Sequence, residues 1–223
     1  MAAPEPALTR RGRPPRFSRE QIVEAVAEML LADPTAPLTI ARAAEAVGAK
    51  PMSLYRHFTD RDDLVAAVTA HVFAGTRPDH LPDQPWQEQV RFWMTSVYRR
   101  ARQVPQLVQL AATGESAEWL MDSSWLAKVF EASGAADDAT IAEAVYWVAT
   151  TTMGHVLIAA AGHDRAPVGR VRTTLDRLDG ADADRMRRLL PHFDVMRHDG
   201  FDRVVEWTIA GVEELLRSSR RGC

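Results

Sequence analysis

A short stretch near the N-terminus, AKPMSLYRHF at residues 49–58, is rich in side chains that can form hydrogen bonds. On a helix, Leu54 and Phe58 share one inward face because they are four residues apart. The outward rows then pair Met52 with Arg56 and Ser53 with His57. Arginine can bind guanine through two acceptors, serine can bond base edges or phosphate, and methionine can contact a thymine methyl group. The stretch is therefore either an ordinary solvated surface or a helix that reads bases in the major groove.

The residues around this helix have the chemistry of phosphate contacts, which position a protein on DNA without reading its sequence. The flanking candidates are Lys50, Tyr55, His57 and Arg61. Thr39 and Arg42, at the start of the preceding predicted helix, are candidates for the opposite side of the groove. An arginine-rich N-terminal arm could lie in the minor groove, as basic arms do. Its arginines are Arg10, Arg11, Arg13 and Arg16.

Local signals predict the helices that would position these side chains. Ser18 and the glutamine three residues later have capping-box spacing at the start of a helix. Thr39 is the predicted N-cap of a short helix, which ends before Gly48, where a turn needs positive φ. Pro51 suits the first turn of the next helix, and Asp60 begins a fourth. Two short helices joined by a glycine turn and flanked by longer helices indicate a helix-turn-helix.

Composition limits the class of protein. The chain has 223 residues, of which 46% are hydrophobic, so it can bury a sizeable core, and its net charge of −3 excludes a uniformly basic protein. One cysteine, Cys223, allows no disulfide within the chain, which suits a cytoplasmic protein, and no signal-peptide pattern opens the sequence. The most apolar stretch, residues 141–162, contains Glu143 and His155, so we expect a buried helix rather than a membrane span.

Glycine and proline interrupt the chain between Gly75 and Pro85, where we place a domain junction. The sequence thus predicts an all-α chain made of a basic arm, a helix-turn-helix domain and a larger helical domain, at residues 1–17, 18–76 and 77–223. No alternating strand pattern is present. The helices predicted after the junction lie at about 86–103, 105–113, 116–132, 137–161, 168–178, 182–190 and 199–217.

Residues 10 to about 72 resemble the DNA-binding domain of the tetracycline-repressor (TetR) family. The resemblance rests on RRGRPPRFSREQIVEAVAEML, on LTIARAAEAVGAKPMSLYRHFTDRDDL and on their spacing. It implies an all-α homodimer that mostly represses transcription until a small molecule binds the C-terminal domain. The positions it implies for base contacts are Pro51, Met52, Ser53 and Arg56, and those for phosphate are Tyr55, His57 and Arg61. Lys50 departs from the pattern, because the family often has serine there and lysine cannot cap a helix by accepting a bond.

The C-terminal part predicts a subunit interface. Residues 199–216 resemble the closing helix of one TetR subgroup, and residues 141–162 are apolar on nearly every face, so they must be covered all round. This segment is either a central core helix alone or a core helix whose outer face pairs with a second subunit. The resemblance favours a homodimer formed through residues 137–161 and 199–217. Twofold symmetry would make the double-stranded operator a pseudo-palindrome.

Bulky residues on several of these helices suggest an adaptable pocket for a hydrophobic or aromatic effector. The candidates are Trp93, Met94, Trp119, Met121, Trp125, Tyr146, Trp147 and His155. For each one alone, a place in the core is the plainer interpretation, and His155 suits a hydrogen-bonded core histidine. The histidines lack metal-ligand spacing and have no cysteine pair beside them, so we expect neither metal nor cofactor.

Three functions compete. The leading one is a ligand-responsive transcriptional repressor, and the second is a DNA-binding regulator without an inducer. The third is a helical enzyme, for which Asp122, Ser123, Ser124 and His155 are the scattered candidates. The chain has no glycine-rich phosphate loop and no Gly-x-Ser-x-Gly turn, so we do not expect an enzyme.

Overall fold

The computed structural model describes residues 17–78, 84–113, 119–134, 137–160 and 168–222. Within these ranges all regular elements are helices, which confirms the predicted all-α fold. The helices of the described ranges are also too short or too polar to cross a membrane.

The N-terminal helices are α1 (Arg19–Ala32), α2 (Ile40–Ala46), α3 (Pro51–Leu54) and α4 (Arg61–Phe73). Their predicted start signals are confirmed. Ser18 and Gln21 exchange both bonds of a capping box, at 3.2 and 2.9 Å. Thr39 and Asp60 cap α2 and α4 by accepting from backbone N–H groups. Gly48 adopts a φ of 62°, so α2 turns directly into the segment leading to α3.

One apolar cluster holds these helices together. Ile22 and Val26 of α1 and Val68 of α4 are at most 1% exposed, and they pack with Leu54 and Phe58 from the α3 segment. Two residues from further along the chain, Val104 and Leu107, belong to the same cluster. The N-terminal core is therefore completed by α6 (Pro105–Thr113).

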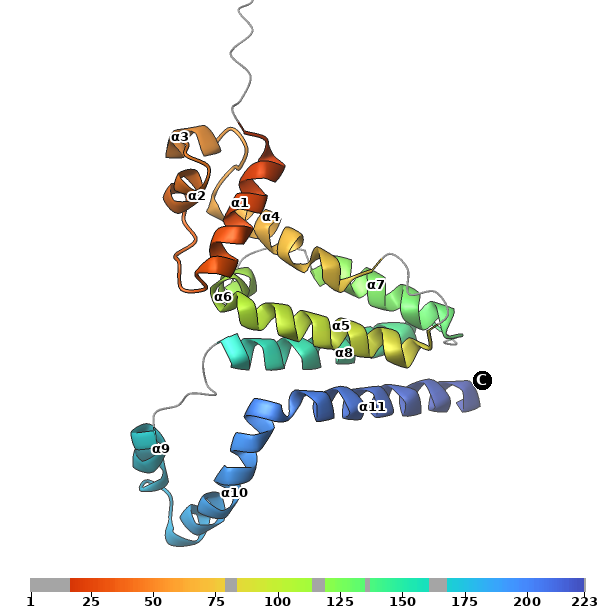
Figure 1. Cartoon of the computed structure of the whole chain (residues 1–223). Helices are drawn as coiled ribbons and strands as arrows, with labels where there is room; N and C mark the ends of the chain where they lie inside the picture. The colour runs from red at the N-terminus through yellow and green to blue at the C-terminus, as the bar shows by residue number, and fades with distance from the viewer. Residues whose placement is uncertain (1–16, 79–83, 114–118, 135–136, 161–167, 223) are drawn as a thin grey trace, which may run out of the picture.

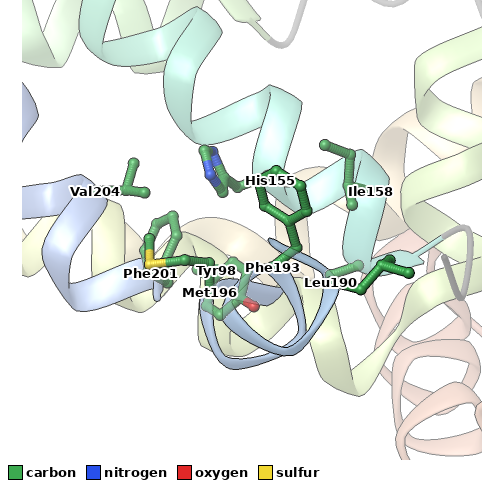
Figure 2. A pocket seen from close by; sticks show the side chains of 9 residues that line it. Tyr98, His155, Ile158, Leu190, Phe193, Met196, Phe201 and Val204 are labelled. Carbon is green, nitrogen blue, oxygen red and sulfur yellow. The ribbon is translucent and has the colours of Figure 1, made fainter. Parts of the chain in front are cut away.

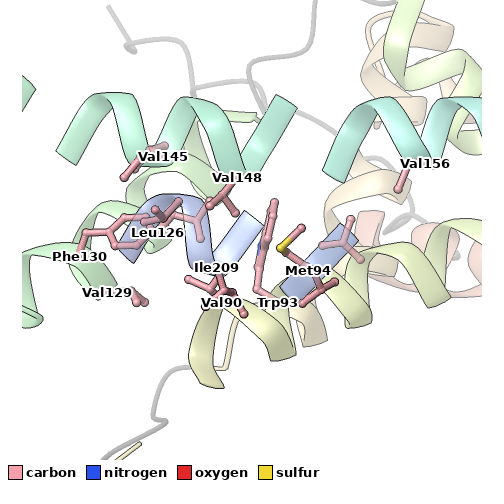
Figure 3. Packing of buried hydrophobic residues seen from close by; sticks show 14 of the residues in the cluster. Val90, Trp93, Met94, Leu126, Val129, Phe130, Val145, Val148, Val156 and Ile209 are labelled. Carbon is pink, nitrogen blue, oxygen red and sulfur yellow. The ribbon is translucent and has the colours of Figure 1, made fainter. Parts of the chain in front are cut away.

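The larger part of the chain is a second helical layer. A short 3₁₀ turn, η1 (Ala74–Thr76), leads from α4 toward it. Its body consists of α5 (Trp86–Gln103), α7 (Trp119–Ala132), α8 (Asp138–Ala160) and α11 (Phe201–Gly222). In Figure 1, α9 (Val168–Leu175) and most of α10 (Gly180–Asp199) project away from this body. Figure 3 shows its core, where Val90, Met94, Leu126, Phe130 and Val148 from α5, α7 and α8 are each fully buried.

Several predicted helix boundaries differ from those observed, and two of the differences affect the candidate sites. The segment 51–58, interpreted above as one helix, is α-helical only to Leu54. Beyond it the chain forms turns, in which the N–H groups of His57 and Phe58 both donate to the Leu54 carbonyl, at 2.8 and 2.9 Å. The helix predicted at 182–190 runs instead from Gly180 through Pro191 to Asp199. A proline inside a helix loses one backbone hydrogen bond. Pro191 is exposed, so water can bond the carbonyl that lacks its helical partner.

Candidate nucleic-acid interface and ligand cavity

The AKPMSLYRHF segment, residues 49–58, presents its polar side chains outward. Leu54 and Phe58 are each 1% exposed, whereas Met52 and Tyr55 are 76% and 52% exposed. Pro51, Arg56 and Arg61 are exposed as well, and Ser53 and His57 are half-buried. The structure therefore gathers the predicted base-facing residues on one surface, anchored from below by Leu54 and Phe58.

Arg19 on α1 fixes the end of this segment. Its guanidinium donates to the His57 carbonyl and pairs with Asp63 at 2.5 Å, and it lies 4.4 Å from the centre of the Phe58 ring. Asp63 also accepts from the Thr59 N–H at 2.9 Å. The bond from Arg19 holds the pKa of Asp63 below its ordinary value, with a further contribution from Thr59. The sequence did not predict this role, because the partners of Arg19 lie 38 and 44 residues away along the chain.

Lys50 stands at the N-cap of α3 and makes no side-chain capping bond, as its chemistry requires. The Ser53 hydroxyl donates to the Lys50 carbonyl at 2.6 Å, which leaves the hydroxyl oxygen able to accept. Lys50 is exposed beside the α3 surface. Its ammonium group is thus placed next to the candidate base-reading surface without serving the helix that begins there.

Some predicted phosphate contacts have partners inside the protein. Arg61 donates from Nε to the Leu38 carbonyl at 3.0 Å, and Arg42 pairs with Glu45 at 2.7 Å. Thr39 is occupied as the cap of α2, where it accepts from the Arg42 N–H. The predicted residues of the arm lie outside the described residues, and they are Arg10, Arg11, Arg13 and Arg16.

The predicted ligand residues are not brought together. Trp93 and Met94 are 3% and 0% exposed within the core, where Trp93 Nε1 donates to Asp122 at 3.2 Å. Trp125 Nε1 donates to the Pro78 carbonyl at 3.1 Å. Three others lie at the surface, namely Met121, Tyr146 and Trp147. The side chain of Trp119 lies outside the described residues.

A cavity of about 380 Å³ lies between α5, α8, α10 and α11. Figure 2 shows the side chains around it. Its lining consists of Tyr98, His155, Ile158, Ala159, Leu190, Phe193, Met196, Phe201 and Val204. Of the predicted ligand residues whose side chains the structure describes, His155 is the one that lines it. The sequence did not predict the residues that α10 contributes to this cavity. The predicted helix ended at residue 190, before Pro191, whereas Phe193 and Met196 of the lining follow that proline.

An acidic group ties the end of α4 to the second layer. Asp122 on α7 lies 3.5 Å from the Arg77 guanidinium, just after η1, and accepts from Trp93. Burial raises the pKa of Asp122, and Arg77 and the Trp93 N–H act in the opposite direction. His155 instead bonds the Thr151 carbonyl through Nδ1. Asp122 therefore does not orient His155, and these two candidates for an enzymatic site have separate partners.

An apolar surface runs over the outer faces of α8 and α11. Tyr146, Met153, Ile158 and Trp207 are 72%, 44%, 51% and 61% exposed. Trp147 packs over Gly211, where a Cβ would lie 2.5 Å from its ring. Glycine therefore permits close packing of the two helices, while large apolar side chains remain exposed beside their contact.

In the part of the chain that the structure describes, no group of three or more His, Cys, Asp or Glu side chains is arranged to hold a metal ion. The site thus consists of an exposed helix-turn-helix surface and a separate apolar cavity.

Solved structures share this fold along nearly the whole chain. Apo ActR from Streptomyces coelicolor has a TM-score of 0.71 at 21% identity, with 95% of this chain and 100% of that chain covered. A possible TetR family transcriptional regulator from the same species has a TM-score of 0.67 at 22% identity, with 92% and 100% covered. TetR from Acinetobacter baumannii AYE has a TM-score of 0.60 at 18% identity, with 90% and 99% covered.

No protein-family model and no curated protein sequence matches the chain. At these identities the solved structures establish the fold. The chain has the all-helical fold of TetR family regulators.

Proposed function

We propose that the chain is a TetR-family transcriptional regulator that binds operator DNA and is released by a small hydrophobic or aromatic effector. The observation that carries the proposal is the α3 surface. Its exposed Met52 and Arg56 are positioned over a buried Leu54–Phe58 anchor, and its end is fixed by Arg19. Such a surface has a hydrogen-bond donor for base edges in the major groove and an apolar side chain for thymine methyl groups.

The division of labour proposed for this surface follows the side chains. Met52, Ser53 and Arg56 read bases, with Pro51 beside them. Phosphate is contacted by Lys50, Tyr55, His57 and Arg61, by Thr39 and Arg42 on α2, and by the arginines of the arm. Arg61 and Arg42 keep or exchange their internal partners on binding, since guanidinium groups have several donors. The DNA-binding domain spans residues 18–76, with α6 as its support.

The cavity favours an effector-controlled regulator over one without an inducer, because a regulator controlled by partners alone needs no such space. The effector acts by binding better to the conformation that does not fit the operator, and so shifts the population away from DNA. This coupling is reciprocal, so operator DNA must weaken effector binding by the same factor. ActR has been solved with (S)-DNPA and with actinorhodin. The proposal includes no enzymatic role, and it has the protein act in the cytoplasm together with the DNA that it binds.

Selection of bound DNA from a random double-stranded pool tests the function directly. We expect enrichment of a pseudo-palindrome with two half-sites, because a twofold dimer presents two α3 surfaces to successive major grooves. Arg56→Ala should relax the preference at one base pair per half-site, by about 1–3 kcal/mol. A pool that remains random after selection would contradict the proposed function.

A further inference from the structure

The cavity between α5, α8, α10 and α11 has a mostly apolar lining. Seven of its nine lining residues are aliphatic, thioether or phenylalanine side chains, and the polar ones are Tyr98 and His155. Among the side chains that the structure describes, no acidic residue, lysine or arginine is part of this lining. An ion placed here would lose its hydration without gaining a counter-charge, which is costly. The lining therefore selects an uncharged molecule.

His155 supplies a directed acceptor in this lining. Its Nδ1 lies 2.9 Å from the Thr151 carbonyl one turn earlier on α8. A carbonyl oxygen accepts and cannot donate, so Nδ1 carries the hydrogen of this bond. In a neutral imidazole the second nitrogen, Nε2, is then an acceptor. The neutral ring therefore offers Nε2 to accept a hydrogen bond from a ligand.

Aromatic packing holds this part of the wall in place. The Phe201 ring stacks on Tyr98, with centres 3.9 Å apart and planes within 10°, and its centre lies 5.7 Å from that of His155. Figure 2 shows His155 and Phe201 at one side of the cavity and Phe193 of α10 facing them. Phe193 is 45% exposed, so the cavity is open to solvent beside α10. A flat ligand can enter there and lie against the rings.

We infer that the cavity binds an uncharged, largely apolar and flat molecule that donates one hydroxyl hydrogen bond to Nε2 of His155. This inference deepens the proposed function, because the same molecule would be the effector. Its hydroxyl replaces one bond to water with one bond to the imidazole, and its rings fill the space between Phe193, Phe201 and Met196. A ligand that has the rings without the donor leaves Nε2 unpaired, which costs affinity.

Three matched tricyclic probes test the donor: 2-hydroxyfluorene, 2-methoxyfluorene and fluorene-2-carboxylate. Binding to the full chain is measured by calorimetry in the absence of DNA. We expect the hydroxyl compound to bind about tenfold more tightly than the methoxy compound, as one hydrogen bond implies. The carboxylate should bind more weakly than both. Equal affinities for the hydroxyl and methoxy compounds would overturn the inference, as would binding of none of the probes.

Variants assign the preference to His155. His155→Leu should abolish the hydroxyl preference, whereas His155→Gln, which keeps an acceptor, should retain part of it. Phe193→Ala should weaken all three probes without changing their order, because it removes a wall and leaves the acceptor. His71→Leu on α4, an exposed histidine outside the lining, is the matched control and should change neither affinity nor order. A hydroxyl preference that survives His155→Leu would contradict the role of Nε2.

Failure of this inference can be told apart from failure of the proposed function. If random-pool selection enriches an operator but the probes show no hydroxyl preference, the ligand class is wrong and the regulator proposal stands. If the preference is found but no DNA is enriched, the cavity proposal stands and the regulator proposal falls. Thermal unfolding of every variant identifies any that fails to fold, and His155→Gln, with its reduced hydroxyl preference, still tests the role of Nε2 if His155→Leu is such a case.

Discussion

Lys50 combines two properties that rarely serve one residue. It occupies the N-cap of α3, where a side-chain oxygen would bond a backbone N–H, yet its ammonium group can only donate. It is also exposed beside the candidate base-reading surface. We interpret the residue as one that gives up local helix stability in favour of a contact with a phosphate oxygen.

Lys50→Ser separates these two properties. Serine can accept from a backbone N–H of α3, so the free energy of unfolding should rise by about 1 kcal/mol. Operator affinity should fall, and the slope of its salt dependence should decrease by about one counterion because one phosphate contact is lost. Urea unfolding and binding isotherms at several salt concentrations measure the two effects. Lys128→Ser, an exposed lysine on α7, is the matched control; operator affinity unchanged by Lys50→Ser would refute the phosphate contact.

Arg19 shows why part of the site was beyond sequence reasoning. Local patterns placed Leu54, Phe58 and the outward residues correctly, because helical spacing alone decides which side chains share a face. The bonds from Arg19 to His57 and Asp63 join residues 38 and 44 positions apart. Such contacts depend on how α1 packs against α4, and no local spacing encodes that packing.

At the scale of elements, the sequence predicted the helices that have local start signals. It did not predict the cavity wall beyond His155. Ser18, Thr39 and Asp60 each mark a helix start through a bond three residues away. In α10 the local signal of Pro191 pointed the wrong way, because helix formation on both sides of it outweighed one lost backbone bond. The cavity needs α10, so its lining could not be assembled from sequence beyond His155.

Helix α6 links the two layers. Gln106 donates to the Thr35 carbonyl, after α1, at 2.6 Å, and Gln109 donates to the Ala160 carbonyl, at the end of α8, at 2.8 Å. Ala159, which precedes Ala160 on α8, lines the cavity. A change in the cavity wall therefore has a short physical route to the helix-turn-helix, through one helix that also contributes Leu107 to the N-terminal core.

The contact between Asp122 on α7 and Arg77 after η1 is a second link, and it has a pH signature. Burial raises the pKa of Asp122, with Arg77 and Trp93 opposing it. A carboxyl with a raised folded-state pKa contributes stability that is complete below the unfolded pKa, about 3.9, and is lost as pH rises through the folded value. Asp122→Asn lacks this pH-dependent contribution. The free energy of unfolding of the variant minus that of wild type should therefore increase from about pH 4 upward.

Urea unfolding at a series of pH values checks this prediction. Asp184→Asn on α10, an exposed aspartate paired with Arg187, is the control and should not reproduce the trend. A constant difference would contradict the raised pKa of Asp122, and a difference that decreases with rising pH would show that Arg77 outweighs burial there. In that case the link between η1 and α7 would be a net stabilising ion pair.

At the scale of the whole molecule, the outer faces of α8 and α11 have no cover from the part of the chain that the structure describes. Trp207 lies one turn before Gly211, against which Trp147 packs, so the two tryptophans belong to one surface. Tyr146 and Met153 extend it along α8. Large exposed apolar patches mark interaction sites. We propose that a second copy of the chain covers this patch through α8 and α11. These helices correspond to residues 137–161 and 199–217, the ranges predicted from the sequence to form the dimer.

Trp207→Glu tests the dimer without disturbing the fold of one subunit. The side chain is 61% exposed in the single chain, so its replacement should leave thermal unfolding of the monomer nearly unchanged. Across a twofold axis the substitution removes two aromatic contacts and brings two carboxylates into an apolar interface, so the dimer Kd should rise at least about a hundredfold. Sedimentation measures the Kd, and Leu178→Glu, an exposed residue between α9 and α10, is the control. Because one subunit carries a single α3 surface, the same variant should bind a half-site with unchanged contacts but lose the gain in affinity that comes from joining two half-sites.

A wild-type chain that sediments as a monomer at micromolar concentration would rule out this dimer, and with it the expected pseudo-palindrome.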